Sequence, residues 1–510
     1  MSMAHTADAV QLVRQSTTHH NAAAPPAARF RVIFAFSAVA FLQGVTFSTF
    51  ALVPDLSIDL LPTLTTDIEG WTLNCNNIAQ MIFIPFAIYL LRKRLLPSTT
   101  TGLRTIAIIG GASQLAQSLC WYCAVMIPPT SSLVNVLVLV GSCAGGVCTG
   151  CVQGACSRLS CVWFPPAERG SATGNVYASL FLGQACATAA SIFFCAENDI
   201  RRLLLGQLFA SLLLGGAIVA YFPDRPQQSS LGLARAPEMA GEEPLLVVED
   251  GPLEHRGSAE SNDAVMAGRA LCTMAHPGRA SLLILLAISW STGAYQAYQQ
   301  VLPLAFADEG SATTLPCNSS AYERLRRRDG DLFALASSVT YALGGPVAGV
   351  LADRYFVRNL KRLMLLCFLC LGVNFGFILF TMPPPPILNS DTGGVRFGPG
   401  GEWLSLFAVG MSGLFAGMAA VPALELLAEA QTLSEGASAN LVMLGIQVFA
   451  ITMTYLTNVF ATPGLGIVMT ASIFCCVVVL IFVEEVYGRL DRMDPDDEER
   501  ELRNSEAVDR

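Results

Sequence analysis

The sequence predicts an all-α membrane protein with twelve transmembrane helices in two six-helix halves. Of its 510 residues, 53% are hydrophobic and only 14% are charged, whereas soluble domains carry about 25% charged residues. Twelve apolar stretches are each long enough for the roughly 20-residue helix that crosses a bilayer. A long polar segment separates them into six and six. This pattern excludes a soluble globular enzyme and is typical of a solute carrier.

Each expected helix follows from one apolar stretch. In the first half the predicted spans are 31–53, 70–91, 104–126, 132–155, 171–194 and 202–222. In the second half they are 281–306, 331–352, 362–382, 403–425, 438–460 and 465–486.

The polar segments predict the domain organisation. Residues 1–29 lack the apolar core of a signal peptide, so we expect a disordered cytosolic tail and insertion through the first transmembrane helix. Residues 223–280 are rich in proline, acidic and small residues and cannot bury enough apolar surface to fold alone. We therefore expect a cytosolic linker there, between six-helix bundles at 30–222 and 281–486. Residues 487–510 form an acidic cytosolic tail.

Basic residues in the short connections predict the orientation, because cytosolic loops carry an excess of lysine and arginine. Those expected on one side, together with both tails and the linker, are Arg92, Lys93, Arg94, Arg104, Arg158, Arg169, Arg354, Arg358, Lys361 and Arg362. The exceptions are Arg201, Arg202 and a cluster from Arg324 to Arg328. Asn318 begins an Asn-Ser-Ser glycosylation sequon on the opposite side. Both termini are expected in the cytosol, and we favour the plasma membrane over an organellar membrane.

Charged side chains are nearly absent from the predicted spans. Glu197, Asp308, Glu425 and Glu484 fall at their ends, and none of the five histidines lies in a helix. Proton-coupled carriers need a titrating group on the solute path. The sequence therefore favours facilitated diffusion, or coupling through the charge of the solute.

Neutral polar and aromatic side chains within the helices are the candidates for solute binding. They are Gln43, Phe47, Asn77, Tyr295, Gln296, Tyr298 and Gln447. An amide facing lipid would be costly, so these groups should face the interior. There they either bind solute or join helix to helix. Uncharged amides beside aromatic rings suit a zwitterion or an organic cation, which rings attract by cation–π interaction.

Glycines Gly141, Gly145, Gly146, Gly150 and Gly154 follow one another at short intervals in the fourth helix. Small residues on one helical face allow close approach of helix backbones. We expect these glycines to pack helices rather than contact solute.

The connection after the eighth helix, Gly349 to Arg354, resembles the cytoplasmic signature of the major facilitator superfamily. In that signature an aspartate, here Asp353, and nearby basic residues, here Arg354 and Arg358, form a latch that holds the outward-open state. The glycine expected after Arg354 is missing, and the loop from Arg92 to Arg104 lacks the motif. The alternative is a positive-inside loop without a gating role.

Four stretches are similar to the haem, choline and ethanolamine transporter family related to the feline leukaemia virus subgroup C receptor, a branch of the major facilitator superfamily. They are Phe36–Phe47; Trp71 with Pro85 and Gly102–Thr105; Ser157–Arg158 with Val162–Phe164 and Glu168; and Glu425 and Glu429 with Ser434–Ser438, Gln447 and Phe449.

The resemblance implies the major facilitator fold and a choline-contacting pocket at Phe47 and Gln447, with a looser correspondence at Tyr295 and Tyr298. This chain has Phe47 where the family has tryptophan, and Leu180 and Phe181 where it has an Asn-Gln pair. We assign to the conformational gate Asp353, Arg354, Arg358, Arg158, Glu168, Glu425, Glu429 and Glu435.

The resulting hypothesis is a facilitative carrier of choline- or ethanolamine-type organic cations that works by alternating access. Alternatives are a haem transporter, a carrier of amino acids or other small nutrients, and a non-transporting receptor or scaffold. We find no catalytic set, phosphate-binding loop or metal-ligand cluster in the helices, so no enzyme, cofactor or metal is expected. The net charge of −9 argues against nucleic acid. The expected partners are a small solute and the lipid bilayer, with the protein acting as a monomer.

Overall fold

The structure is a computed structural model that describes residues 26–47, 49–50, 60–61, 66–92, 102–129, 131–164, 168–191, 193–194, 197–223, 279–305, 329–356, 359–381, 401–430, 435–459 and 462–483. This part of the chain contains twelve long helices, one for each predicted span. They are α2 (Pro26–Phe47), α4 (Thr66–Arg92), α5 (Leu103–Met126), α6 (Leu133–Trp163), α7 (Arg169–Ser191), α8 (Glu197–Tyr221), α10 (Arg279–Ala305), α12 (Asp329–Arg354), α13 (Leu360–Thr381), α14 (Gly401–Ala430), α15 (Glu435–Val459) and α16 (Thr462–Ile481).

Seven of the helices are long and apolar enough, by length and composition within the described residues, to cross a bilayer: α2, α4, α6, α8, α12, α13 and α14. Most of the others carry buried polar side chains. Gln114 and Gln117 lie in α5, Gln299 in α10 and Gln447 in α15. Interior polar groups lower the hydropathy of α5 and α10, whereas the described parts of α15 and α16, Ala439–Met453 and Ile467–Ile481, are apolar but shorter. These helices still pack within the bundle.

Several helix ends differ from the predicted spans. α2 ends at Phe47 instead of residue 53, followed by a turn in which Thr49 N donates to Thr46 O. α6 continues to Trp163 instead of residue 155, with Leu159 and Trp163 buried in the core of the first half. Hydropathy detects only the part of a helix that crosses lipid. It misses turns that extend beyond the bilayer and are held by packing.

The expectation that Glu425 marks a helix end is wrong. α14 continues to Ala430, and Glu425 is buried within it. The neighbouring Leu426 and Leu427 are fully buried in the core of the second half, and this packing stabilises the helix beyond Glu425.

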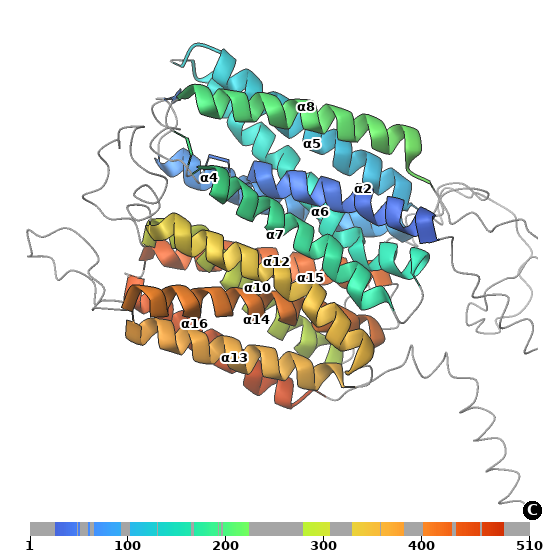
Figure 1. The fold of residues 1–510 in the computed structure, drawn as a ribbon, viewed down its shortest axis with the longest axis vertical. Helices are drawn as coiled ribbons and strands as arrows, with labels where there is room; N and C mark the ends of the chain where they lie inside the picture. The colour runs from blue at the N-terminus through green and yellow to red at the C-terminus, as the bar shows by residue number, and fades with distance from the viewer. Residues whose placement is uncertain are drawn as a thin grey trace, which may run out of the picture.

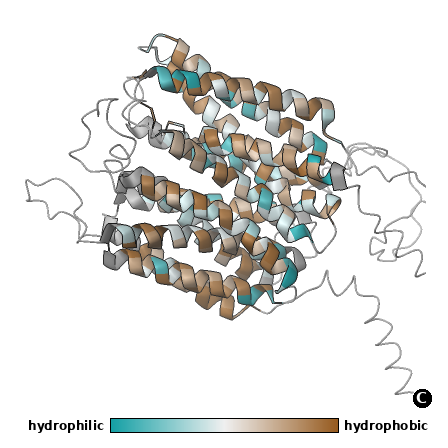
Figure 2. Ribbon diagram, viewed as in Figure 1, coloured by the Kyte–Doolittle hydropathy of each residue, from teal (hydrophilic) through white to brown (hydrophobic). Residues whose placement is uncertain are grey.

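The helices form two groups. In Figure 1, α2 to α8 lie in the upper group and α10 to α16 in the lower one. The groups meet where α7 lies against α12 and where α15 lies against α4 and α6. Figure 2 shows hydrophobic residues along most of the outer helices and hydrophilic residues mainly near the helix ends. Exposed apolar side chains such as Phe34, Phe209 and Phe407 make this surface suited to lipid.

Most basic residues of the described helices lie at one end of the bundle, which we call the basic end. They are Arg29, Arg31, Arg104, Arg158, Arg169, Arg354, Lys361 and Arg362. Contacts between helix ends confirm this arrangement. Arg104 donates to Val219 O at 3.3 Å, and Lys361 donates to Ile481 O at 3.2 Å. Arg201 and Arg202 lie at the opposite end, at the start of α8.

Glycines bring helix backbones into direct contact. A Cβ atom on Gly174 of α7 would lie 2.6 Å from the carbonyl oxygen of Gly345 in α12. The predicted packing role of the α6 glycines is confirmed, since side chains or backbone of α4, α5 and α15 occupy the space beside them. Gly146 lies against Asn76 O and Gly154 against Asn440. At Gly174 and Gly345 the backbones of α7 and α12 therefore approach each other with no side chain between them.

We predict that Gly174→Val lowers the thermal stability of the purified protein, because overpacking a tight interface costs about 1–3 kcal/mol. Gly206→Val is the matched control, since a Cβ at Gly206 in α8 would meet nothing within 4 Å. Thermal unfolding in detergent measures the difference. Equal midpoints for the two variants would contradict the tight α7–α12 contact.

Candidate functional site

A cavity lies between the two halves, near the middle of the helices. Its lining comes from α2, α4, α6, α7, α10 and α15, and comprises Gly44, Phe47, Asn76, Asn77, Gln80, Thr149, Gln153, Leu180, Phe181, Gln184, Gln296, Gln299 and Gln447. Eight of these residues carry a carboxamide and none carries a charge. The volume is about 40 Å³. A water molecule needs about 10–15 Å³ by this measure, so the cavity has room for only a few waters in this arrangement.

Four of the sequence-predicted binding residues line the cavity. Phe47 comes from the last turn of α2, Asn77 from α4, Gln296 from α10 and Gln447 from α15. Two lie in the first half and two in the second, so the structure brings together residues up to 400 positions apart in the chain. Solute binding by these residues stays a prediction.

The other three predicted residues lie behind the cavity wall. Gln43 is fully buried, and its Nε2 donates to Gly145 O and to Thr149 Oγ1, both at 3.0 Å. Tyr295 is buried in a hydrogen bond with Ser337 and accepts a hydrogen bond from Gln299 Nε2 at 3.2 Å. These two residues hold lining residues in place. Sequence alone cannot separate the two roles, because both layers consist of buried polar side chains.

Tyr298 belongs to an aromatic cluster. Its ring meets Phe375 edge-on with centroids 5.0 Å apart, and lies 6.4 Å from the ring of Tyr295. Tyr295 in turn stacks on Tyr341 at 5.3 Å, and Tyr341 lies 3.9 Å from Phe181, which lines the cavity. The cluster therefore connects α10 and α12 to the α7 wall of the cavity.

Several lining residues were not assigned from the sequence: Asn76, Gln80, Thr149, Gln153, Leu180, Phe181, Gln184 and Gln299. A signal for them exists. Asn76 and Gln80, Thr149 and Gln153, and Leu180 and Gln184 are each four residues apart, the spacing of side chains on one helical face. The face that lines the cavity follows these pairs.

Unpaired polar atoms face this region. Among the described residues, Asn76 Oδ1, Asn77 Nδ2 and Gln447 Oε1 are buried without a hydrogen-bond partner, whereas Gln80 Nε2 donates to Gln153 Oε1 at 3.0 Å. A buried unsatisfied polar atom costs about 1–3 kcal/mol. An amide offers both a donor and an acceptor. The cavity can therefore hydrogen-bond a small polar solute.

At the basic end, Asp353 joins the two halves. Its carboxylate, in the last turn of α12, accepts hydrogen bonds from Gly170 N at 3.2 Å, Ser171 N at 2.9 Å and Ser171 Oγ at 2.7 Å. These groups form the N-terminus of α7, whose free N–H groups and dipole favour an anion. The described partner of Asp353 is therefore a helix end of the other half. Arg354 is exposed, and Arg358 lies outside the described residues.

A second bond between the halves was not expected from the sequence. Asn440 of α15 donates through Nδ2 to Gly154 O of α6 at 2.9 Å. Gly154 lies near the end of α6 and Asn440 near the start of α15. Together with Asp353 and the contact of Gly174 with Gly345, this bond closes the bundle on the basic side of the cavity.

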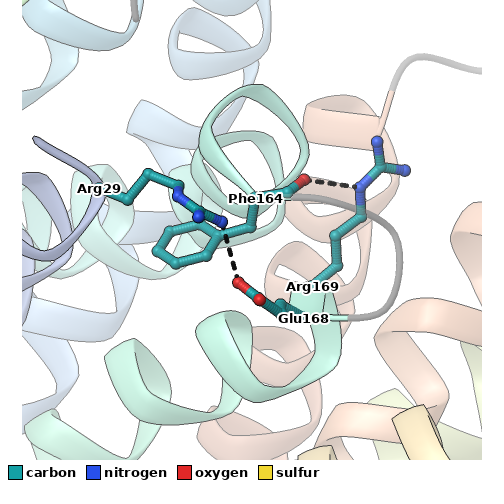
Figure 3. Close-up of polar contacts among 4 residues, drawn as sticks. All are labelled: Arg29, Phe164, Glu168 and Arg169. Carbon is teal, nitrogen blue, oxygen red and sulfur yellow. Dashed lines mark hydrogen bonds and ion pairs between the residues drawn. The ribbon is translucent and has the colours of Figure 1, made fainter. Parts of the chain in front are cut away.

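Among the described residues, Glu168 bonds within its own half. Its carboxylate accepts a hydrogen bond from Arg29 Nη1 at 3.0 Å, and Arg29 lies 5.9 Å from the ring of Phe164. Arg169 Nε donates to Phe164 O at 3.4 Å (Figure 3). This cluster fixes α2 to the connection between α6 and α7.

The remaining predicted gate residues are distributed around the basic end. Arg158 is partly buried near the end of α6, and Glu425 is buried in α14. Glu429 lies in the last turn of α14 and Glu435 begins α15, and the side chains of both lie outside the described part of the chain. Asn318 also lies outside the described residues.

The sequence model of the Major Facilitator Superfamily matches residues 32–430. No curated protein sequence matches the chain. Among solved structures, the chain is similar to a Major Facilitator Superfamily transporter, FucP, in the outward conformation, with a TM-score of 0.55 and 13% identity. It is equally similar to a variant of the E. coli fucose:proton symporter FucP, with a TM-score of 0.55 and 12% identity. Both matches cover 90% of this chain and 100% of the other. At this identity the likeness concerns the fold alone.

We predict that Asp353→Ala accelerates amide hydrogen exchange at the first turn of α7 by at least about tenfold, since hydrogen bonds to a charged group contribute about 1.5–3 kcal/mol. Hydrogen–deuterium exchange with mass spectrometry measures it. Arg354→Ala, which changes the exposed neighbouring residue, should leave the exchange rate unchanged. An unchanged rate in Asp353→Ala would show that this carboxylate does not hold the helix end.

Proposed function

The chain belongs to the Major Facilitator Superfamily, and on this premise we propose that it is a facilitative carrier of small organic cations of the choline or ethanolamine type. Family membership and the shared fold make it a multi-pass membrane transporter that works by alternating access on a small solute, and not an enzyme. The choice of solute is the part that we propose.

The uncharged, amide-rich cavity is the observation that carries the proposal. Carbonyl oxygens of Asn76 and Gln447 are buried and unpaired, so they suit the hydroxyl of choline or the ammonium of ethanolamine. Phe47 and Phe181 supply aromatic rings at the same cavity. A ring face attracts an organic cation by about 0.5–2 kcal/mol.

The lining also supports transport without a coupling ion. Among the described residues that line the cavity, none carries an ionisable acid or base. A cation crossing there would bring its own charge and move down the membrane potential. A potential of 100 mV contributes about 2.3 kcal/mol per charge, which corresponds to roughly fifty-fold accumulation.

The closed basic end supports assigning this arrangement to one state of the alternating-access cycle. If the basic end faces the cytosol, as the excess of arginine there favours, this arrangement is closed toward the cytosol. A cavity of about 40 Å³ cannot enclose choline, so the halves must part to admit it. The hydrogen bonds of Asp353 and Asn440 would break when the opposite state forms.

A second candidate is a carrier of a neutral or zwitterionic nutrient. Asn77 Nδ2 is a buried, unpaired donor at the cavity and suits a carboxylate or hydroxyl oxygen of such a solute. A haem transporter is disfavoured, because haem iron takes His, Cys, Met or Tyr ligands and the described cavity lining contains none of these.

We predict that Gln447→Ala raises the KM for choline uptake about tenfold, the effect of losing one hydrogen bond of roughly 1.4 kcal/mol. Asn374→Ala is the matched control. Asn374 is an amide in α13 that donates to Cys370 O of its own helix, away from the cavity. Radiolabelled uptake into proteoliposomes measures both. Wild-type kinetics in both variants would remove Gln447 from the binding site.

We further predict that uptake of choline rises with a potential negative inside and is insensitive to a protonophore when the potential is clamped. Proteoliposomes with potassium gradients and valinomycin test this. Zwitterion uptake without voltage dependence would favour the second candidate. Loss of uptake on collapsing a pH gradient at constant potential would contradict an uncoupled carrier.

A further inference from the structure

Aromatic rings of the two halves meet beside the central cavity, on the side of the basic end. Tyr177 and Phe181 belong to α7 in the first half, and Tyr341 belongs to α12 in the second. All three side chains are buried. The ring of Tyr341 lies 3.9 Å from that of Phe181 and 6.3 Å from that of Tyr177, measured between centroids. We call Tyr177 and Tyr341 the tyrosine pair.

The order of contacts along α7 places the tyrosine pair between the basic end and the cavity. In Figure 1, α7 and α12 lie next to each other where the two groups of helices meet. From the basic end, Ser171 and Gly174 contact α12 first, Tyr177 follows about one turn later, and Phe181 lines the cavity after another turn. The corresponding order on α12 is Asp353, Gly345 and Tyr341. The pair is therefore the last layer of contact between α7 and α12 before the cavity.

The hydroxyls of the tyrosine pair are buried, and neither forms a hydrogen bond with a described residue. They lie close enough to each other to interact, but not in the geometry of a hydrogen bond. Neither residue lines the cavity. A buried hydroxyl without a partner costs free energy, whereas the same hydroxyl is satisfied in water. Hydration would therefore stabilise both groups relative to this closed arrangement.

Tyr295 supports Tyr341 from within the second half. Its ring stacks on that of Tyr341 with centroids 5.3 Å apart and an interplanar angle of 18°. The hydroxyl of Tyr295 shares a hydrogen bond with Ser337 and accepts one from Gln299 at 3.2 Å. Both partners belong to the same half as Tyr295. The ring of Tyr341 is therefore fixed to the second half, and that of Tyr177 moves with the first.

We propose that the tyrosine pair is a gate between the cavity and the basic end, and that its buried hydroxyls set how readily the gate opens. Ring contacts block the path between α7 and α12 in the closed state. When these helices part, water enters between the rings and both hydroxyls gain hydrogen bonds. The rings thus favour the closed state, and the hydroxyls favour the open one.

The gate opposes the hydrogen bonds that hold the basic end closed. Asp353 and Asn440 join the halves in this arrangement and stabilise it. A carrier must populate both states to turn over, so the stabilisation of either state has to stay small. The hydroxyls of the pair offset part of the closing interactions. This inference rests on alternating access and not on the choice of solute.

Hydrogen–deuterium exchange of the full-length purified protein tests the gate at the first turn of α7, whose N–H groups bind Asp353 of the other half. Tyr341→Phe keeps the ring and removes the hydroxyl. We expect it to slow exchange there about fivefold, which corresponds to about 1 kcal/mol. Tyr341→Ala should accelerate exchange by at least about fivefold, because the lost ring contact outweighs the lost hydroxyl. Unchanged or faster exchange in Tyr341→Phe, as expected of a residue that only supports the fold, would overturn the proposal.

Tyr298→Phe is the matched control. The hydroxyl of Tyr298 is also buried without a hydrogen-bond partner, but its ring packs on Phe375 of its own half at 5.0 Å. This variant should leave exchange at the first turn of α7 unchanged. Exchange at the start of α5, which packs on helices of the first half, is the reference for general stability. Equal slowing by both phenylalanine variants, or a parallel change at α5, would contradict the gate. No solute is needed, so a failure of the choline proposal leaves this test unaffected.

Discussion

The bundle depends on one carboxylate that caps a helix of the opposite half. Asp353 satisfies the N–H groups of Gly170 and Ser171, which would otherwise lack partners at the start of α7. From this point α7 and α12 run side by side, so the cap joins the two halves at the end of their shared contact. The contact of Gly174 with Gly345 lies one turn further along α7 and completes the closure. The central cavity lies further along α7, where Leu180, Phe181 and Gln184 line it.

The residues around the cavity form two layers: an inner layer that lines it and an outer layer behind the lining. The two layers have different roles. The inner layer offers amides with unpaired atoms. The outer layer includes Gln43 and Tyr295, which form hydrogen bonds with Thr149 and Gln299 of the inner layer. The orientation of the Gln299 amide is therefore fixed before a solute arrives, and less entropy is lost when it binds. The outer layer also explains why so many polar residues occur in helices that cross a membrane.

Hydropathy predicted all twelve helices, because every helix that crosses the bilayer needs an apolar stretch of roughly 20 residues. It could not predict ends that depend on packing, such as the extension of α6 to Trp163. Phe47 and Gln447 could be placed at the cavity from chemistry and resemblance. The layer to which Gln43 belongs depends on the rotation of α2, which sequence leaves open. The motif around Asp353 was visible, but its partner Ser171 is 182 residues away and lies in the other half.

Bare backbone at the meeting surfaces has a consequence for how this carrier can diversify. A substitution at Gly174 or Gly345 collides with the facing helix, so these positions are closed to change. On the same helix, Gln184 lines the cavity between the halves instead of meeting the backbone of the facing helix. Solute specificity can therefore change through substitutions at the cavity while the interface between α7 and α12 is kept. A carrier with a new solute specificity would keep the same helix interface and the same conformational change.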